Sequence, residues 1–188
     1  MSFEAAVEAI DRGEIVGLPT DTVYGLAIDP SNETAVSRLY ELKGRPAGKP
    51  IGLLAASLDQ AATIGVIEGV AAELAGRFWP GALTLVVRPR VILPNWVSGE
   101  QARTVGIRVP DHDTAIGFLA ETGPLAVTSA NLSGGPETYD HNGARAVLGD
   151  RVAFYIEGSC RGGMASTVVD ATGTDLVVLR EGDIDPSG

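Results

Sequence analysis

The amino-acid sequence predicts a single α/β domain built on a mixed β-sheet. Apolar runs of strand length alternate with stretches of helical periodicity along most of the chain, and the last third ends in three apolar runs without a helix between them. Alternation favours parallel pairing, whereas the strand-rich ending favours antiparallel edges. The 188 residues, 45% of them hydrophobic, suit one domain with its own core, so we expect one domain over residues 1–188.

The first elements alternate as helix, strand and helix. Residues 2–12 place apolar side chains at helical spacing and are followed by Gly13, which predicts an amphipathic helix. Residues 15–18 are a short apolar run that ends before Pro19, which predicts a strand. After a turn-rich segment, residues 33–42 again show helical spacing.

The later elements follow from the same two patterns. Helical spacing predicts helices at 57–63, 67–78, 112–121 and 140–148. Apolar or β-branched runs predict strands at 51–55, 82–88, 105–109, 125–128, 152–156, 166–170 and 175–180. Residues 89–104 fit neither pattern, which predicts a surface loop beside a site.

The net charge argues against a protein that coats nucleic acid. Lys and Arg number 14 against 24 Asp and Glu, which gives a formal charge of −10. A protein that works by neutralising phosphates usually carries a basic face. Any polyanion or phosphate site must therefore rest on a local cluster of cations.

Such a cluster lies at residues 43–50. The only two lysines of the chain, Lys43 and Lys49, flank Arg45 in a segment punctuated by glycines and prolines. A helix ending near Leu42, with Gly44 as its C-cap, would explain one of these cations but not three. We therefore expect this loop to bind an anion. It is not a P-loop, because three rather than four residues separate its glycines and a proline follows Lys49.

Polar residues also collect where two predicted strands end. One group is Thr20, Asp21, Thr22 and Tyr24, and the other is Thr128, Ser129, Asn131 and Ser133. Strand ends are common ligand sites in open α/β sheets. A hydrogen-bonded turn explains each group about as well.

Two arginines sit on apolar strands. Arg108 lies inside a predicted strand, where an unpaired charge is costly, so it must reach the sheet rim or meet an anion. Arg180 follows an apolar run, and a surface salt bridge to Glu181 or Asp183 is the simplest explanation for it.

The cysteine and histidine content argues against a disulfide-bonded or metal-binding protein. A single cysteine, Cys160, excludes an intrachain disulfide and a cysteine-rich zinc site. His112 and His141 have no partner at metal-ligand spacing, so no metal ligand is expected from the protein. No apolar run reaches membrane-helix length. We expect a cytoplasmic protein without membrane contact.

Six motifs together resemble those of the YrdC family, the threonylcarbamoyl-AMP synthases. Each is weak alone, but all six occur in the family's order and span almost the whole chain. They are PTDTVYGL (19–26), KGRP with a following KP (43–50), TVGIRVP (104–110), TSANLSG (128–134), STVVD (166–170) and LREG (179–182).

The resemblance implies a fold and a reaction. The fold is a twisted α/β sheet with flanking helices around a large concave cavity that binds L-threonine and ATP side by side. In the reaction, L-threonine, bicarbonate and ATP, with Mg²⁺, give threonylcarbamoyl-AMP and pyrophosphate. This adenylate serves tRNA modification, and tRNA is reached only indirectly, through a separate transferase. The chain looks like the short, single-domain bacterial type.

The resemblance also implies roles for individual residues. Lys43 and Arg45 are expected to be catalytic. The nucleotide is expected to contact Lys43, Arg45, Lys49, Thr104, Ser129, Ala130, Asn131, Thr138 and Arg180. Threonine is expected to contact Thr22, Arg108, Thr128 and Ser166.

Two other functions compete with this one. The same cavity could hold a nucleotide or an RNA end without catalysis, as a binding module. It could instead belong to a related domain that handles carbamoyl-adenylate, although such domains normally sit inside much longer proteins. Pyrophosphate release with and without threonine separates these alternatives.

Overall fold

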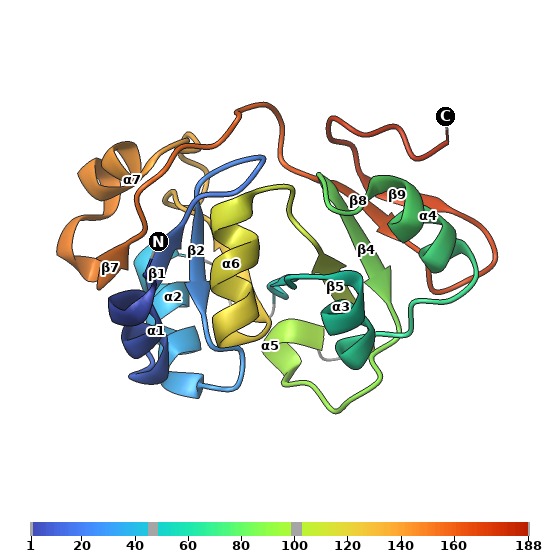
Figure 1. Ribbon diagram of the computed structural model, residues 1–188, viewed down its shortest axis with the longest axis horizontal. Coiled ribbons are helices and arrows are strands. Elements are labelled where there is room, and N and C mark those ends of the chain that lie inside the picture. The colour runs from blue at the N-terminus through green and yellow to red at the C-terminus, as the bar shows by residue number, and fades with distance from the viewer. Residues whose placement is uncertain (1, 45–48, 99–102, 188) are drawn as a thin grey trace.

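A mixed sheet runs through the whole molecule (Figure 1). The structure is a computed structural model, and it describes residues 2–44, 49–98 and 103–187. Within these ranges the sheet has nine strands in the order β7-β1-β2-β6-β3-β5-β4-β8-β9. The strands are β1 (Val16–Leu18), β2 (Gly25–Ile28), β3 (Leu53–Leu54), β4 (Leu83–Val87), β5 (Val105–Arg108), β6 (Leu125–Ser129), β7 (Phe154–Tyr155), β8 (Thr167–Asp170) and β9 (Val177–Arg180).

The pairing confirms a mixed sheet but corrects the prediction for its edges. At one edge β9 is antiparallel to β8, as expected. At the other edge β7 is parallel to β1, which contradicts the expectation of antiparallel edges. The chain reaches β7 through a helix rather than a hairpin, and such a connection permits parallel pairing.

Helices cover both faces of the sheet. They are α1 (Glu4–Asp11), α2 (Glu33–Lys43), α3 (Leu58–Ile64), α4 (Val70–Phe78), α5 (Asn95–Ser98), α6 (Asp113–Thr122), α7 (His141–Leu148) and the 3₁₀ turn η1 (Gly149–Arg151). None of the helices in the described ranges is both long and apolar enough to span a membrane.

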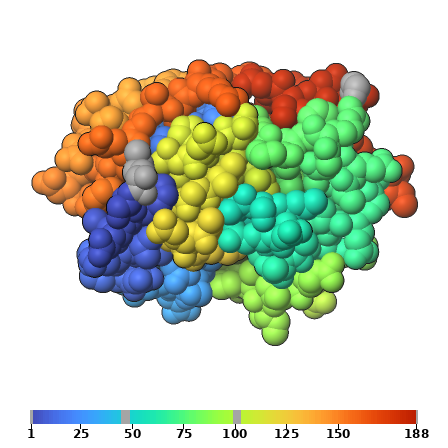
Figure 2. Space-filling view, viewed as in Figure 1, coloured from blue at the N-terminus to red at the C-terminus, as the bar shows by residue number. Residues whose placement is uncertain are grey.

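The core divides into two apolar clusters. In the smaller, α1 and α6 pack on each other, with the ring centroids of Phe3 and Phe118 5.6 Å apart. Figure 2 shows α1, α6 and α3 side by side on this face of the molecule. The larger cluster joins α2, with Leu39 fully buried, to the central strands and to α3, α4 and α7. Burial of these apolar faces is the main favourable term for the fold.

The elements predicted from apolar periodicity are present, with ends that differ by a few residues, and three further elements appear: β2, α5 and the short turn η1. Strand β2 was not predicted, because all four of its residues are buried and show no alternation. Helix α5 lies inside the predicted loop 89–104, and four residues are too few to produce a helical pattern.

Helix α2 ends as the sequence indicates. Asn32 caps its start by accepting a hydrogen bond from the backbone of Ala35 at 3.1 Å. Gly44 caps its end in the left-handed conformation, with φ at 58°. Lys43 is therefore the last residue of a helix, and it is buried. This corrects the expectation that Lys43 lies on a polar loop.

Candidate active site

A cavity of about 730 Å³ lies on one face of the central strands. The alternation of β4 shows how the sequence builds it: Leu83 and Leu85 turn into the core, whereas Thr84 and Val86 line the cavity. The two neighbours of β4 line it in the same way, β5 with Arg108 and β8 with Val168.

Two glycines line this cavity at positions where a side chain would be crowded. A Cβ atom at Gly25 would lie 2.7 Å from a methyl group of Val127, closer than real Cβ atoms approach. A Cβ atom at Gly106 would touch Thr84 at 3.4 Å. Both glycines line the cavity, so their missing side chains leave room for a ligand.

Many of the predicted site residues meet in this cavity although they come from distant parts of the sequence. The predicted nucleotide and threonine residues that line it are Thr22, Lys49, Thr104, Arg108, Thr128, Ser129, Ser166 and Arg180. Lys43, Ala130, Asn131 and Thr138 are not among its lining residues. Arg45 lies outside the residues that the structure describes.

Lys43 is buried outside the cavity lining and organises the end of β6 and the loop that follows it. Its ammonium group donates to the backbone carbonyl of Ser129 and to both the carbonyl and the Oδ1 atom of Asn131, the last two at 2.7 and 3.1 Å. The backbone carbonyl of Lys43 accepts from the N–H of Ser133 at 2.9 Å. The helix end and this loop are thus fixed to each other.

The other predicted residues that do not line the cavity also support the same loop. Asn131 donates through Nδ2 to the carbonyl of Gly135 at 2.6 Å and accepts from the hydroxyl of Ser129 at 2.6 Å. The hydroxyl of Thr138 donates to the carbonyl of Ala130 at 2.9 Å. These bonds satisfy buried polar groups and shape the loop.

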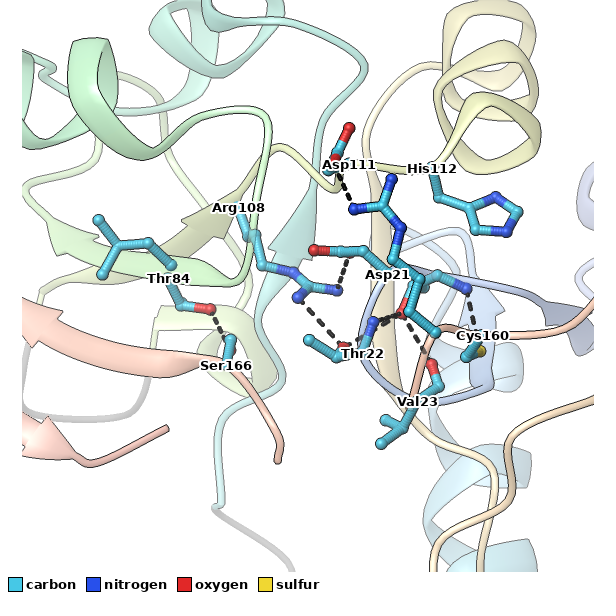
Figure 3. Close-up of polar contacts among 12 residues, drawn as sticks. Asp21, Thr22, Val23, Thr84, Arg108, Asp111, His112, Cys160 and Ser166 are labelled. Atoms are coloured by element: carbon cyan, nitrogen blue, oxygen red, sulfur yellow. Dashed lines mark hydrogen bonds and ion pairs between the residues drawn. The ribbon is translucent and has the colours of Figure 1, made fainter. Parts of the chain in front are cut away.

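Arg108 projects from the end of β5 and meets the turn after β1, as Figure 3 shows. Its Nη2 atom lies 3.3 Å from Oδ1 of Asp21, and its Nη1 atom donates to the hydroxyl of Thr22 at 3.2 Å. Burial lowers the pKa of the Arg108 guanidinium from its ordinary value, and the carboxylate of Asp21 acts in the opposite direction. The sequence did not identify Asp21 as its partner.

The turn after β1 is both a hydrogen-bonded turn and part of the cavity wall. The hydroxyl of Thr20 donates to the carbonyl of Val23 at 2.8 Å and accepts from the N–H of Thr22 at 3.2 Å. The Sγ atom of Cys160 accepts from the N–H of Thr20 at 3.4 Å. Tyr24, in contrast, is fully buried and donates its hydroxyl to the carbonyl of Ile156, so it belongs to the core.

Arg180 lines the cavity from β9, and the simplest explanation offered for it from the sequence is wrong. Its guanidinium donates to the carbonyl of Ser166 at 3.1 and 2.7 Å and to the hydroxyl of Ser166 at 3.1 Å, rather than pairing with Glu181 or Asp183. The hydroxyl of Ser166 also lies 2.8 Å from that of Thr84 (Figure 3). Ser166, just before β8, therefore holds Arg180 and links it to Thr84 of β4.

Sequence reasoning missed some lining residues. Glu137 is the one carboxylate among the described residues that line the cavity, and it favours the charged form of Arg180. Thr84 sits in a strand predicted from its β-branched residues, and nothing marked Thr84 as a site residue. No group of three His, Cys, Asp or Glu side chains in the described ranges is arranged to hold a metal ion.

Comparisons with known proteins agree on one family. The family model Sua5_yciO_yrdC, described as telomere recombination, matches residues 8–182. A protein of Mycobacterium tuberculosis is 43% identical over 188 residues, which cover 96% of this chain and 83% of the relative. The threonylcarbamoyl-AMP synthase of Vibrio cholerae is 37% identical over 96% of this chain and 97% of its own length.

A solved structure of an archaeal relative is similar throughout this chain. The structure of Pyrococcus abyssi Sua5 complexed with L-threonine superposes with a TM-score of 0.86 at 37% identity. The superposition covers 94% of this chain but only 53% of the archaeal one, so this chain spans about half the length of that relative.

Proposed function

Because the chain belongs to the Sua5/YciO/YrdC family, we propose that it is a threonylcarbamoyl-AMP synthase. One observation links family membership to this reaction. Arg108 and Arg180 line the same cavity, one from β5 and the other from β9. Two separated guanidinium groups suit two anionic groups, the carboxylate of an amino acid and the phosphates of a nucleoside triphosphate. A cavity of about 730 Å³ has room for both.

The proposed reaction has two steps. The amine of L-threonine and bicarbonate form a carbamate with loss of water. A carbamate oxygen then attacks the α-phosphorus of ATP, the bond from that phosphorus to the bridging oxygen breaks, and pyrophosphate leaves. The carbamate and ATP both carry negative charge, so holding them side by side is the main task of the protein.

The lining residues divide between the two substrates. Arg108 and Thr22 lie together at the turn after β1, and we assign them to the threonine carboxylate. Arg180 and Lys49 are cations of the cavity wall, and we assign them to the phosphates. The remaining contacts to each substrate that the sequence predicts stay proposals. For Lys43 we propose an indirect role instead, because its ammonium holds the backbone of Ser129 and Asn131.

Mg²⁺ fits this site as a companion of ATP rather than as a resident ion. Glu137 lines the cavity together with several threonine and serine residues, and Mg²⁺ commonly takes one or two carboxylates while keeping several waters. Glu137 would hold the ion directly or through water. When bound, Mg²⁺ neutralises charge on the phosphates.

The product is an activated intermediate for tRNA modification, and we assign the transfer to tRNA to a separate transferase. A net charge of −10 disfavours a broad RNA footprint on this chain. A purely binding role for the cavity is the second candidate, because the same cations could hold a nucleotide without reaction.

Pyrophosphate release tests the proposal against that candidate. The protein is incubated with ATP and Mg²⁺, with L-threonine and bicarbonate added together or each omitted. A synthase releases pyrophosphate only in the complete mixture and forms an equal amount of threonylcarbamoyl-AMP. Nucleotide binding without release in the complete mixture supports the binding module, and release that does not require threonine rejects both assignments.

A further inference from the structure

We propose that Asp21 is a positioning residue for threonine binding, acting through Arg108 without touching the substrate. The inference rests on the proposed function and names a residue that this function did not require. Asp21 follows β1, Arg108 ends β5, and their side chains meet at 3.3 Å between Oδ1 and Nη2 (Figure 3).

Because the Arg108–Asp21 ion pair is buried, the guanidinium depends on Asp21 for its counter-charge. The side chains of Arg108 and Asp21 are only 6% and 5% exposed, whereas the other ion pairs of the described residues are far more exposed. A buried guanidinium without a counter-charge is strongly disfavoured. The nearby cation Arg180 adds to that cost, because it too disfavours the charged form of Arg108. Asp21 is the acidic partner that acts against both effects and counters them in part.

The geometry of the pair leaves the fork of Arg108 open to a ligand. Oδ1 of Asp21 is buried and accepts no hydrogen bond among the described residues, so the contact supplies charge without using an aligned N–H donor. The Nη1 atom is fixed by the hydroxyl of Thr22. Arg108 lines the cavity and Asp21 does not, so Asp21 contacts the guanidinium without itself lining the cavity.

Asp21 has two opposite effects on the binding of threonine by Arg108. Asp21 fixes the position of the guanidinium, which strengthens a two-point contact with a carboxylate. It also cancels part of the positive charge that attracts that carboxylate. We infer that positioning dominates, because an unpaired Arg108 would turn toward water or toward other acceptors, and a small misplacement of a binding group is costly.

The first test is threonine binding by calorimetry to the Asp21→Asn variant, with a non-hydrolysable ATP analogue measured in parallel. Asn has the size of Asp but no charge. We expect the threonine Kd to rise by about tenfold to a hundredfold, with the Kd of the analogue changed by less than about threefold. An unchanged or lowered threonine Kd overturns the proposal.

A second test keeps the proposal falsifiable even if Asp21→Asn is poorly folded. The variants Asp21→Asn, Arg108→Gln and the double variant form a cycle in which the double variant has no buried charge left unpaired. If Asp21 acts through Arg108, adding Asp21→Asn to Arg108→Gln changes the threonine Kd by less than about twofold. A full additional loss in that background shows that Asp21 acts on threonine by another route and rejects the proposal.

A matched control is available nearby. Asp111 pairs with Arg161 at 2.7 Å, but their side chains are 48% and 70% exposed. Asp111→Asn makes the same chemical change at an exposed pair, so it should leave both ligands bound as in the wild type. If wild-type protein binds no threonine at all, the proposed function fails; if wild type binds it and Asp21→Asn binds it equally, only the present inference fails.

Discussion

At the scale of single residues, Lys43 has a different structural role from the one expected. Its place in a cation cluster suggested an exposed phosphate ligand, yet its ammonium is buried against three oxygen atoms, one at the end of β6 and two on Asn131 in the loop that follows. A buried ammonium with several acceptors stabilises the structure around it, and its removal leaves those acceptors unsatisfied. Loss of Lys43 is therefore expected to disturb both stability and the site.

We predict that Lys43→Met lowers the free energy of unfolding by on the order of 1–3 kcal/mol as well as reducing synthase activity, because buried acceptors lose their donor. Urea unfolding followed by circular dichroism measures the change. Lys49→Met is the matched control, since Lys49 is exposed, and should change stability by less than about 0.5 kcal/mol. Equal stability of the two variants would contradict the account.

Cys160 gives a pH-dependent prediction at the same scale. Burial raises the pKa of its thiol from the ordinary value of 9.0 to about 11. Because the folded state favours the protonated form, the associated stability is present below pH 9.0 and is lost as the pH rises toward about 11.

Alkylation by iodoacetamide checks this prediction, because Cys160 is the only thiol of the chain. The rate should rise with a midpoint near pH 11 in the native protein and near pH 9 in urea. A native midpoint at or below that of the unfolded chain would show that burial does not govern this thiol.

What the sequence reveals about the site depends on the kind of residue. Composition drew attention to Lys49, and an arginine inside an apolar strand drew attention to Arg108; both line the cavity. Asp21 was visible in its motif, but its pairing with Arg108 is a contact between the turn after β1 and the distant strand β5. Local spacing carries no information about such a contact, so it appears only when the sheet is assembled.

At the scale of elements, periodicity predicts those that have one buried face. Helix α1 and strand β4 show such a pattern, and both were expected from the sequence. Strand β2 is buried on both faces and begins with Gly25, so its sequence lacks alternation. It is defined by its neighbours: β1 and β6 pair with it on either side.

The left-handed conformation of Gly44 at the end of α2 leads to a prediction about stability. Gly44 has φ at 58°, and a Cβ atom there would meet nothing within 4 Å. Gly44→Ala should therefore destabilise the protein by about 1 kcal/mol through left-handed strain, without any steric clash.

Gly76 is the matched control, because it lies inside α4 with equally open space and no positive φ. Gly76→Ala should stabilise the protein by about 0.5–1 kcal/mol. Thermal melting compares the two variants, and shifts of the same sign would refute the assignment of Gly44 as a strained cap.

At the scale of the whole molecule, the distribution of charge limits which polyanions this chain can bind. The chain carries a net charge of −10, while Lys49, Arg108 and Arg180 line one cavity. Of these, Arg108 already faces a carboxylate. The remaining charges suit the phosphates of one nucleotide and leave little for an RNA backbone.

We therefore predict weak, strongly salt-dependent binding of tRNA, with a Kd of about 10 μM or weaker at physiological salt. Fluorescence anisotropy of labelled tRNA over a salt series measures it. In a reaction with labelled threonine, label should enter the adenylate and not the tRNA until a transferase is added. Label on tRNA with this protein alone would refute the division of labour.

The most direct test of the central claim is a crystal structure with L-threonine and a non-hydrolysable ATP analogue. The account predicts both ligands in the cavity over the central strands, with the threonine carboxylate on Arg108 and the phosphates toward Lys49 and Arg180. Threonine bound away from Arg108, or the two ligands in separate cavities, would contradict it.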